Sequence, residues 1–282
     1  AGGMIPRAVV VVGAGRVGLS LARALRRLGE PVRLLGRTAH PASTETPAVE
    51  VAWDDALASA TLVVIAVADD AVTPVVEAVA ASRALRPATV VLHTSGRHDR
   101  GVLEPLAMLG AVTGSWHPLQ SIPEAADGAV FAGVPAVLEG EGVAVAAGRT
   151  LAEQLGMSPI VELPAAGKVR YHAAAVFAAN YLVALDAIAE RLAREAGAGE
   201  ASRGLFLPIM RQVLDNLAAR TPVEALTGPV RRGDVGTVSA HLAVLEGPDR
   251  EAYLVLAHEA LRLAEKGGLD LDRAAAIRAV LH

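Results

Sequence analysis

Residues 8–18 read AVVVVGAGRVG, a run of β-branched residues that passes directly into three glycines and then into the amphipathic segment 18–28. Such a run predicts a buried strand, and the glycines predict a tight turn that opens a helix. In this spacing Gly13 permits the turn, Gly15 lets the backbone approach a pyrophosphate, and Gly18 allows close helix–strand packing. The predicted phosphate-binding segment at the helix N-terminus comprises Gly13, Ala14, Gly15, Arg16, Val17 and Gly18.

Short β-branched runs alternate with Ala/Leu-rich amphipathic segments as far as residue 163, which predicts an α/β fold with a doubly wound parallel sheet. The predicted strands cover residues 8–12, 32–35, 48–52, 62–67, 89–93, 111–116, 136–138 and 159–162, and the helices between them include 18–28, 71–81, 102–109 and 143–155. After Pro164 the pattern predicts only helices, over residues 166–196, 200–219, 234–245, 249–266 and 270–281. We therefore expect a dinucleotide-binding domain over residues 4–163 and an all-helical C-terminal domain over residues 164–282.

Composition excludes several classes of function. The formal net charge of −4 gives no reason to expect a nucleic-acid or anionic-membrane partner, and the absence of cysteine excludes disulfides and thiolate zinc sites. No metal site is predicted. The apolar stretch 173–189 contains Asn180 and Asp186, which favours a buried helix over a membrane span. We expect a small-molecule partner, with the cytoplasm as the default location.

The end of the second predicted strand indicates which dinucleotide is bound. A site for NAD places an Asp or Glu there, whereas this sequence has Gly36, Arg37 and Thr38. A guanidinium and a hydroxyl suit the 2′-phosphate of NADP, which a carboxylate would repel. Arg16 could add a second positive group. The pattern favours NADP, although a solvated loop arginine would give the same residues.

In an open parallel sheet, ligands lie at the carboxyl ends of the strands, so Ala68 and Thr94 are expected beside the nicotinamide. Ser95 and His117 follow the fifth and sixth predicted strands, and Gln120 follows His117 closely enough to contact a substrate. A hydroxyl and an imidazole there could bind a substrate oxygen and pass its proton during hydride transfer. The alternatives are an ordinary serine turn and a hydrogen-bonded histidine at a strand end.

Lys168 and His172 lie one helical turn apart on one face, and Asn180 lies at the edge of that face. Polar groups in so apolar a helix require partners, either in a structural network or in a ligand site. The lysine could anchor a substrate carboxylate or donate a proton to an alkoxide.

The segment 226–234, LTGPVRRGD, is predicted to be a loop rich in hydrogen-bond donors. Its candidate anion-binding residues are Thr227, Gly228, Arg231 and Arg232. An ordinary turn followed by a solvated arginine pair remains the alternative.

The chain as a whole resembles a group of bacterial Rossmann-like oxidoreductases whose C-terminal helical domain has no assigned function. The resemblance is carried by VVGAGRVG (residues 11–18), LHTSG (92–96), SWHPLQS (115–121), KVRYHAAAVFAANYLVAL (168–185) and LTGPVRRGD (226–234). This group is similar to ketopantoate reductases, prephenate dehydrogenases, β-hydroxyacid dehydrogenases and pyrroline-carboxylate reductases. The helical domain of these enzymes often dimerises, so the resemblance implies a homodimer.

Resemblance to prephenate dehydrogenases implies catalytic roles for Ser95 and His117, and resemblance to β-hydroxyacid dehydrogenases and ketopantoate reductases implies a catalytic Lys168. The chain departs from these patterns at two positions: His172 replaces a usual asparagine, and Gly96-Arg97 stands where prephenate dehydrogenases have a lysine. We expect reduction of a small carboxylate-bearing 2-oxo acid by NADPH, with ketopantoate the specific hypothesis. Oxidation of prephenate or arogenate, reduction of a cyclic imine, and a non-catalytic NADP sensor remain alternatives.

Overall fold

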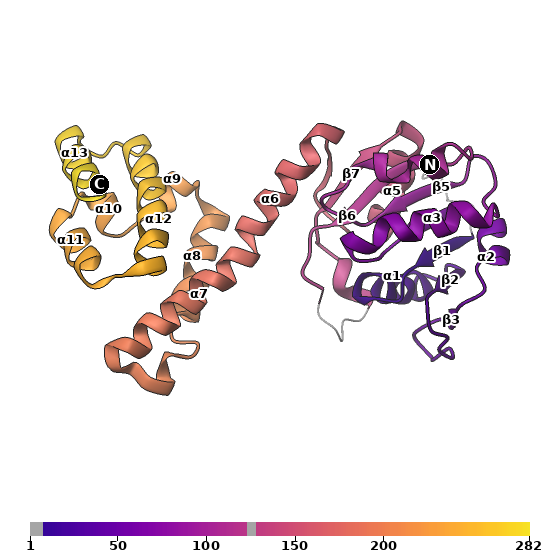
Figure 1. The fold of residues 1–282 in the computed structure, drawn as a ribbon, viewed down its shortest axis with the longest axis horizontal. Coiled ribbons are helices and arrows are strands. Elements are labelled where there is room, and N and C mark those ends of the chain that lie inside the picture. Colours follow the sequence, from indigo (N-terminus) through magenta and orange to yellow (C-terminus); the bar gives the residue numbers. More distant parts are fainter. Residues whose placement is uncertain (1–7, 123–127) are drawn as a thin grey trace. The chain divides into compact units, whose positions relative to one another are not determined.

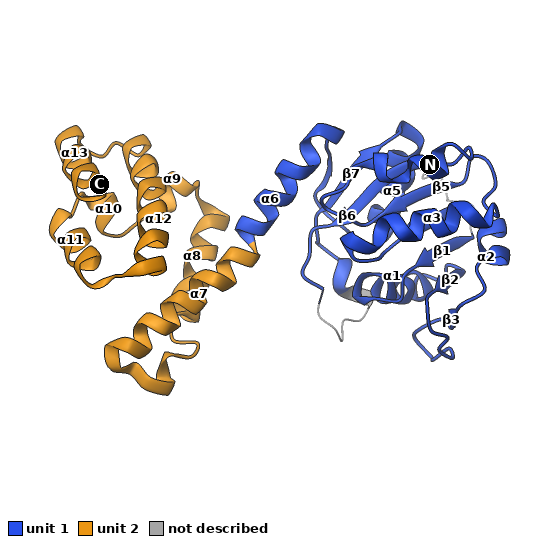
Figure 2. Cartoon of the chain, viewed as in Figure 1, with its two compact units in different colours: residues 1–178 blue, residues 179–282 orange. Residues whose placement is uncertain are grey.

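The computed structural model describes residues 8–122 and 128–282, so the start of the domain predicted over residues 4–163 lies outside the described residues. By its internal contacts the chain divides into two units, Ala1–Ala178 and Ala179–His282, which Figure 2 colours separately. The sequence placed the boundary near Leu163–Pro164. The contacts instead keep the following helix with the first unit, because side chains of its first two turns bond to the sheet residues described below.

The first unit is built on an eight-stranded sheet with the order β3-β2-β1-β4-β5-β6-β7-β8 (Figure 1). The strands are β1 (Val9–Val12), β2 (Val32–Leu35), β3 (Val49–Glu50), β4 (Leu62–Ile65), β5 (Val90–His93), β6 (Val112–Pro118), β7 (Ala136–Gly140) and β8 (Ile160–Glu162). Each of the eight predicted strands has its counterpart, and the predicted α/β class is confirmed.

The direction of β7 and β8 departs from the parallel arrangement expected from the sequence. β7 runs antiparallel to β6, with Ser115 opposite Glu139, whereas the other strand pairs are parallel. A parallel pair needs a long crossover, usually through a helix, but the described part of the β6–β7 connection contains only the short 3₁₀ turn η3 (Gly128–Phe131). The hydrophobic pattern of a strand indicates its burial and not its direction.

Helices cover both faces of the sheet. They are α1 (Arg16–Arg27), α2 (Asp54–Ser59), α3 (Val72–Ser82), α4 (Glu104–Ala107) and α5 (Gly142–Gln154). Val9 and Val11 join one hydrophobic core with residues of α1 and α5, and Val10 and Val12 join a second core with residues of α2, α3 and α4. Successive residues of a strand point to opposite faces, so the four consecutive valines of β1 are buried on both sides.

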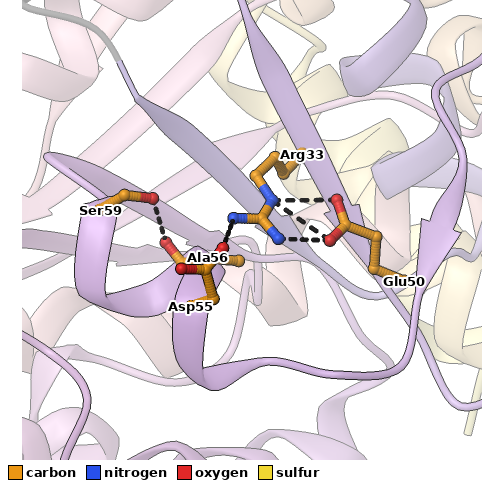
Figure 3. Close-up of polar contacts among 5 residues, drawn as sticks. All are labelled: Arg33, Glu50, Asp55, Ala56 and Ser59. Carbon is orange, nitrogen blue, oxygen red and sulfur yellow. Dashed lines mark hydrogen bonds and ion pairs between the residues drawn. The ribbon is translucent and has the colours of Figure 1, made fainter.

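An ion-pair cluster fastens the short edge strand β3 to its neighbour (Figure 3). Arg33 on β2 donates from Nε to Glu50 on β3 at 3.0 Å and from a terminal nitrogen to Asp55 on α2 at 2.9 Å. In the same helix the Ser59 hydroxyl donates to the carbonyl of Ala56. One guanidinium thus links a two-residue strand to the helix that follows it.

The helix α6 (Lys168–Ala178) ends the first unit, and the second unit is helical throughout, as predicted. Its helices are α7 (Asn180–Ala193), α8 (Leu207–Ala219), α9 (Pro222–Ala225), α10 (Pro229–Arg232), α11 (Val235–Val244), α12 (Gly247–Lys266) and α13 (Leu271–Val280). The predicted loop 226–234 contains α10, which the sequence analysis missed. Pro229 begins this helix, at the position where the fixed φ of proline favours helix initiation.

The apolar stretch 173–189 is not buried, contrary to the prediction. The helix α7 has no buried residue, and Val183 is 71% exposed. The segment Ala165–Ser202 is long and apolar enough to cross a membrane by length and composition, and none of its most apolar window is buried. The hydrophobic core of the second unit is instead formed by residues of α10 to α13, among them Val238, Leu261 and Ile277. Composition alone could not show that this stretch lies outside the core.

Candidate functional site

Four parallel strands end at the same edge of the sheet. The register places Val12 opposite Ile65, Ile65 opposite His93, and His93 opposite Ser115. The segments that follow β1, β4 and β5 therefore lie next to one another, beside the last residues of β6. This is the edge at which open α/β sheets bind their ligands.

The glycine turn after β1 leaves space at one position only. Gly13 has a φ of +114°, and a Cβ there would lie 2.3 Å from the Ala66 carbonyl oxygen. A Cβ at Gly18 would lie 1.8 Å from the carbonyl oxygen of Gly13, whereas a Cβ at Gly15 would meet nothing within 4 Å. Gly15 is also the N-cap of the twelve-residue helix α1, so the open space faces free backbone N–H groups. Ala14 and Val17 pack against the core beneath the turn.

The segment after β2 exposes a basic residue. A Cβ at Gly36 would lie 2.6 Å from Val49, so the chain passes close to β3 before Arg37 and Thr38 emerge at the surface. Arg16, in the glycine turn, is exposed as well. Within residues 8–122 and 128–282, neither arginine forms an ion pair. Both guanidiniums can therefore bind an anion.

Ser95 lies in a rigid, buried turn after β5. Its Oγ accepts the backbone N–H groups of Arg97 and His98, and its own N–H donates to Nδ1 of His93 at 3.2 Å. His93 is fully buried, and its Nε2 bonds to the carbonyl of Asp99 at 3.1 Å. Burial, reinforced by the charge of Lys168, lowers the pKa of His93 to about 3. The imidazole is therefore neutral and fixes the two ends of the turn.

Lys168 begins α6 and is 0% exposed. Its Nζ donates to the carbonyl of Ser95 at 3.1 Å and to Oγ of Ser115 at 2.9 Å, so it joins α6 to the turn after β5 and to the middle of β6. Burial lowers the pKa of Lys168 to about 8, while the nearby carboxylates of Glu139, Asp69 and Asp99 act in the opposite direction. At pH 7 the site thus contains a buried ammonium group.

Glu139 provides a nearby negative charge. Antiparallel pairing places Glu139 on β7 directly opposite Ser115, and its carboxylate accepts the backbone N–H of Arg100 at 2.7 Å. The side chain is only 3% exposed, and burial raises its pKa. The charge of Lys168 lowers that pKa in turn, so each group stabilises the ionised form of the other.

His117 and Tyr171 form a hydrogen-bonded pair. Nδ1 of His117, on β6, lies 2.8 Å from the hydroxyl of Tyr171 on α6. Burial, then the charges of Lys168 and His172, lowers the pKa of His117 to about 4, and burial raises the pKa of Tyr171 to about 12. At neutral pH the imidazole is therefore uncharged and the phenol keeps its proton.

Gly96 lies against both histidines. A Cβ there would be 2.9 Å from Nε2 of His117 and 3.0 Å from Cδ2 of His172. The missing side chain at Gly96 therefore leaves room for both imidazoles. The structure thus brings together four of the five predicted catalytic residues, namely Ser95, His117, Lys168 and His172.

The remaining predicted residues occupy several places. Asn180 begins α7 and belongs to the second unit. Thr94 is buried, and its N–H donates to the carbonyl of Ile65, while Ala68 and Gln120 are exposed at the strand ends. The predicted anion-binding residues Thr227, Gly228, Arg231 and Arg232 all line one pocket of the second unit.

The sequence analysis missed Tyr171, His93, Ser115 and Glu139. Tyr171 lies three residues after Lys168, a spacing at which two side chains share a helix face, so it could have been included. Glu139 is an acid within an otherwise apolar strand, which is also a usable signal. His93 bonds to Ser95 and Asp99 within the turn after β5, whereas the contact of Ser115 with Lys168 depends on the packing of α6, which no local pattern reveals.

Two family models match the chain. A Rossmann-like domain matches residues 4–118, and a domain of unknown function (DUF2520) matches residues 134–260. These matches confirm the resemblance found in the sequence, a Rossmann-like domain followed by a DUF2520 domain. No curated protein matches it.

Solved structures share the fold over nearly the whole chain. A protein of Thermotoga maritima is 23% identical with a TM-score of 0.72, covering 92% of this chain and 98% of that chain. A candidate NADP oxidoreductase of Bacteroides fragilis is 21% identical with a TM-score of 0.65, covering 92% and 96%. The reductive aminase of Aspergillus terreus, in complex with NADPH and ethyl-5-oxohexanoate, is 18% identical with a TM-score of 0.58, covering 97% and 91%. At these identities the likeness establishes the fold.

Proposed function

We propose that the protein is an NADP(H)-dependent oxidoreductase that reduces the carbonyl group of a small 2-oxo acid. The observation that carries this proposal is the convergence of Ser95, His117, Tyr171 and Lys168 at the sheet edge that also bears the glycine turn. The fold shared with a reductase crystallised with NADPH supports the same class.

The glycine turn fits a dinucleotide. The open space at Gly15, at the N-terminus of α1, suits a pyrophosphate, and Arg37 with Thr38 and Arg16 suits a 2′-phosphate. Ala68 and Thr94 follow the neighbouring strands and would flank the nicotinamide. When bound, NADPH supplies the hydride.

His117 would provide the proton. The phenol of Tyr171 keeps its proton and can donate it to Nδ1 of His117, and in that tautomer the imidazole proton lies on Nε2. Nε2 can then give its proton to a carbonyl oxygen as that oxygen becomes a hydroxyl, while Nδ1 takes the phenol proton of Tyr171, so the imidazole stays neutral and Tyr171 regains a proton from solvent. The carbonyl carbon gains the hydride and the oxygen gains this proton, which completes the reduction to an alcohol.

Lys168 has a positioning role in this proposal. Its ammonium is fully buried and donates to two protein oxygens, so it fixes the Ser95 turn and helps to keep His117 neutral. His172 would border the substrate on the other side of Gly96. The catalytic role of Asn180 stays a prediction, which an Asn180→Ala variant with unchanged turnover would contradict.

The function is tested by mixing the protein with NADPH and a panel of 2-oxo acids, with ketopantoate first, while NADPH absorbance is followed. We expect substrate-dependent oxidation of NADPH, a preference for NADPH over NADH that Arg37→Glu reverses, and loss of turnover in His117→Ala. No turnover with any 2-oxo acid would contradict the proposed substrate class. NADP reduction by prephenate or arogenate would favour the dehydrogenase alternative, and tight NADPH binding without any turnover would favour a sensor.

Reduction of imines is the second candidate. It is supported by the fold shared with the A. terreus reductive aminase and with an imine reductase of Streptomyces aurantiacus. The buried ammonium of Lys168 disfavours a cationic iminium in the same site, and for this reason the carbonyl is preferred. Turnover of cyclic imines exceeding that of 2-oxo acids in the same assay would reverse the order.

We also propose that the protein is a homodimer formed through α7 and α8. Neither helix has a buried residue, although Val183, Ile209 and Val213 are 71%, 63% and 47% exposed. Two helices with so much apolar surface and no core contacts gain stability when a second copy covers them. Asp186 and Glu190 on α7 favour a protein partner over a bilayer.

The dimer is tested by light scattering on the full chain. We expect a mass near twice 28.9 kDa, and a dimer that dissociates in Val183→Asp and Ile209→Asp. Val255→Asp provides the control, because Val255 is 70% exposed on α12, outside the proposed interface. A monomeric wild-type protein, or a dimer unaffected by both substitutions, would contradict the proposal.

A further inference from the structure

The second unit contains a surface pocket of about 890 Å³ whose charged lining residues are mostly basic. Arg231, Arg232 and Arg273 contribute three positive charges, and Asp270 is the one acid in the lining. The volume lies in the range of small-molecule sites. The residues of this pocket come from α10, from the start of α13 and from the loops before them.

Two of the guanidiniums are held in place by backbone carbonyls. Arg231 donates to the carbonyl of Gly267 at 3.0 Å, and Arg273 donates to the carbonyl of Arg232 at 3.1 Å. None of the three arginines forms an ion pair within the described part of the chain. Because a guanidinium has five N–H donors, the two that are held keep donors for a ligand and lose little entropy on binding.

Backbone geometry makes room for Arg273. Gly233 has a φ of +68° at the end of α10, and a Cβ there would lie 2.7 Å from Cβ and 3.1 Å from Cδ of Arg273. The stem of Arg273 therefore packs directly on the glycine. Asp270 caps α13 by accepting the N–H groups of Asp272 and Arg273, so its charge is engaged by the backbone and the pocket remains positive.

We propose that this pocket binds the oxyanion, carboxylate or phosphate, of a small organic ligand. Thr227 would add a hydroxyl donor, and Leu226 and Leu269 offer apolar contact to the body of the ligand. The proposal extends the anion-binding role expected for Thr227, Gly228, Arg231 and Arg232. It adds Arg273 and also Gly233, on which the stem of Arg273 packs. All of its residues lie in the second unit, and the proposal does not depend on the proposed reduction.

Calorimetry on the full chain tests the pocket, with inorganic phosphate and ketopantoate as the two probes. We expect wild-type protein to bind at least one probe, and Arg231→Met and Arg273→Met to weaken that binding about 10- to 100-fold. Gly233→Ala keeps every charge but displaces Arg273, and it should also weaken binding. Arg262→Met, which removes an equal charge from the exposed face of α12, should leave it unchanged.

Circular dichroism first establishes that each variant is folded. Weaker binding of ketopantoate, together with a raised KM for NADPH-linked turnover, would identify the oxyanion as that of the substrate. Weaker binding of phosphate with unchanged turnover would identify a separate effector. Wild-type protein that binds neither probe, or pocket variants that bind as tightly as Arg262→Met, would overturn the proposal. These binding measurements remain decisive even if no substrate is reduced.

Discussion

Burial is the main cause of the shifted pKa values of the side chains around Gly96. His93 and His117 are held neutral, with pKa values of about 3 and 4, while Lys168 keeps its charge until the pH approaches about 8. A neutral imidazole beside a buried ammonium group can donate a hydrogen bond without adding a second positive charge to the site. The pairing of His117 with Tyr171 is therefore the contact on which the proposed proton transfer depends.

Replacing Tyr171 by Phe tests this pair. We expect kcat to fall about 10- to 100-fold with little change in KM, because the variant no longer fixes the proton of His117 on Nε2. Tyr253→Phe provides a matched control, since Tyr253 bonds Nδ1 of His241 at 2.9 Å in the second unit. Equal effects of the two substitutions, measured by steady-state kinetics, would show that Tyr171 has no specific role.

At the scale of elements, the three glycines between β1 and the first turn of α1 meet two different requirements, close packing and ligand binding. Gly13 and Gly18 are needed because any side chain would collide with backbone atoms, whereas Gly15 faces open space. The same three-glycine pattern thus combines two positions that permit the fold with one that leaves room for a ligand.

The paired variants Gly18→Ala and Gly15→Ala distinguish these requirements. We expect Gly18→Ala to lower the free energy of unfolding by about 2 kcal/mol or more, because its Cβ meets a carbonyl oxygen. Gly15→Ala should change stability by less than about 0.5 kcal/mol yet weaken NADPH binding at least about 10-fold. Urea denaturation and fluorescence titration measure the two effects. A stable Gly18→Ala, or a Gly15→Ala that binds NADPH normally, would contradict the assignment.

For the whole molecule, buried neutral histidines make stability depend on pH. The pKa values of His93 and His117 are lowered from 6.5 to about 3 and about 4. Between pH 6.5 and 4 the unfolded chain therefore takes up protons that the folded chain does not. The contribution of these two histidines to stability is greatest above pH 6.5 and falls as the pH is lowered, by at most about 1.4 kcal/mol per pH unit for each group.

Denaturation in urea at pH 6.5 and pH 4.5 measures this loss. We expect His93→Asn, whose amide oxygen can accept the Ser95 N–H without titrating, to lose less stability than the wild type over that interval. His258→Asn, at a half-buried histidine on α12, is the control and should behave as the wild type. The same pH dependence in wild type and His93→Asn would show that His93 is not the group responsible.

The sequence by itself determined the eight strands, the glycine turn and the helical nature of the second half, because each of these depends on residue spacing over a few positions. Ser95, His117, Lys168 and His172 could also be chosen in advance, since they follow strand ends or share one helix face. Only the tertiary structure decided that Tyr171 bonds His117, that the reversed strand β7 brings Glu139 opposite Ser115, and that the apolar helix α7 lies outside the core. Those outcomes depend on contacts between residues far apart in the chain, where strand direction and packing, and not local periodicity, determine which groups meet.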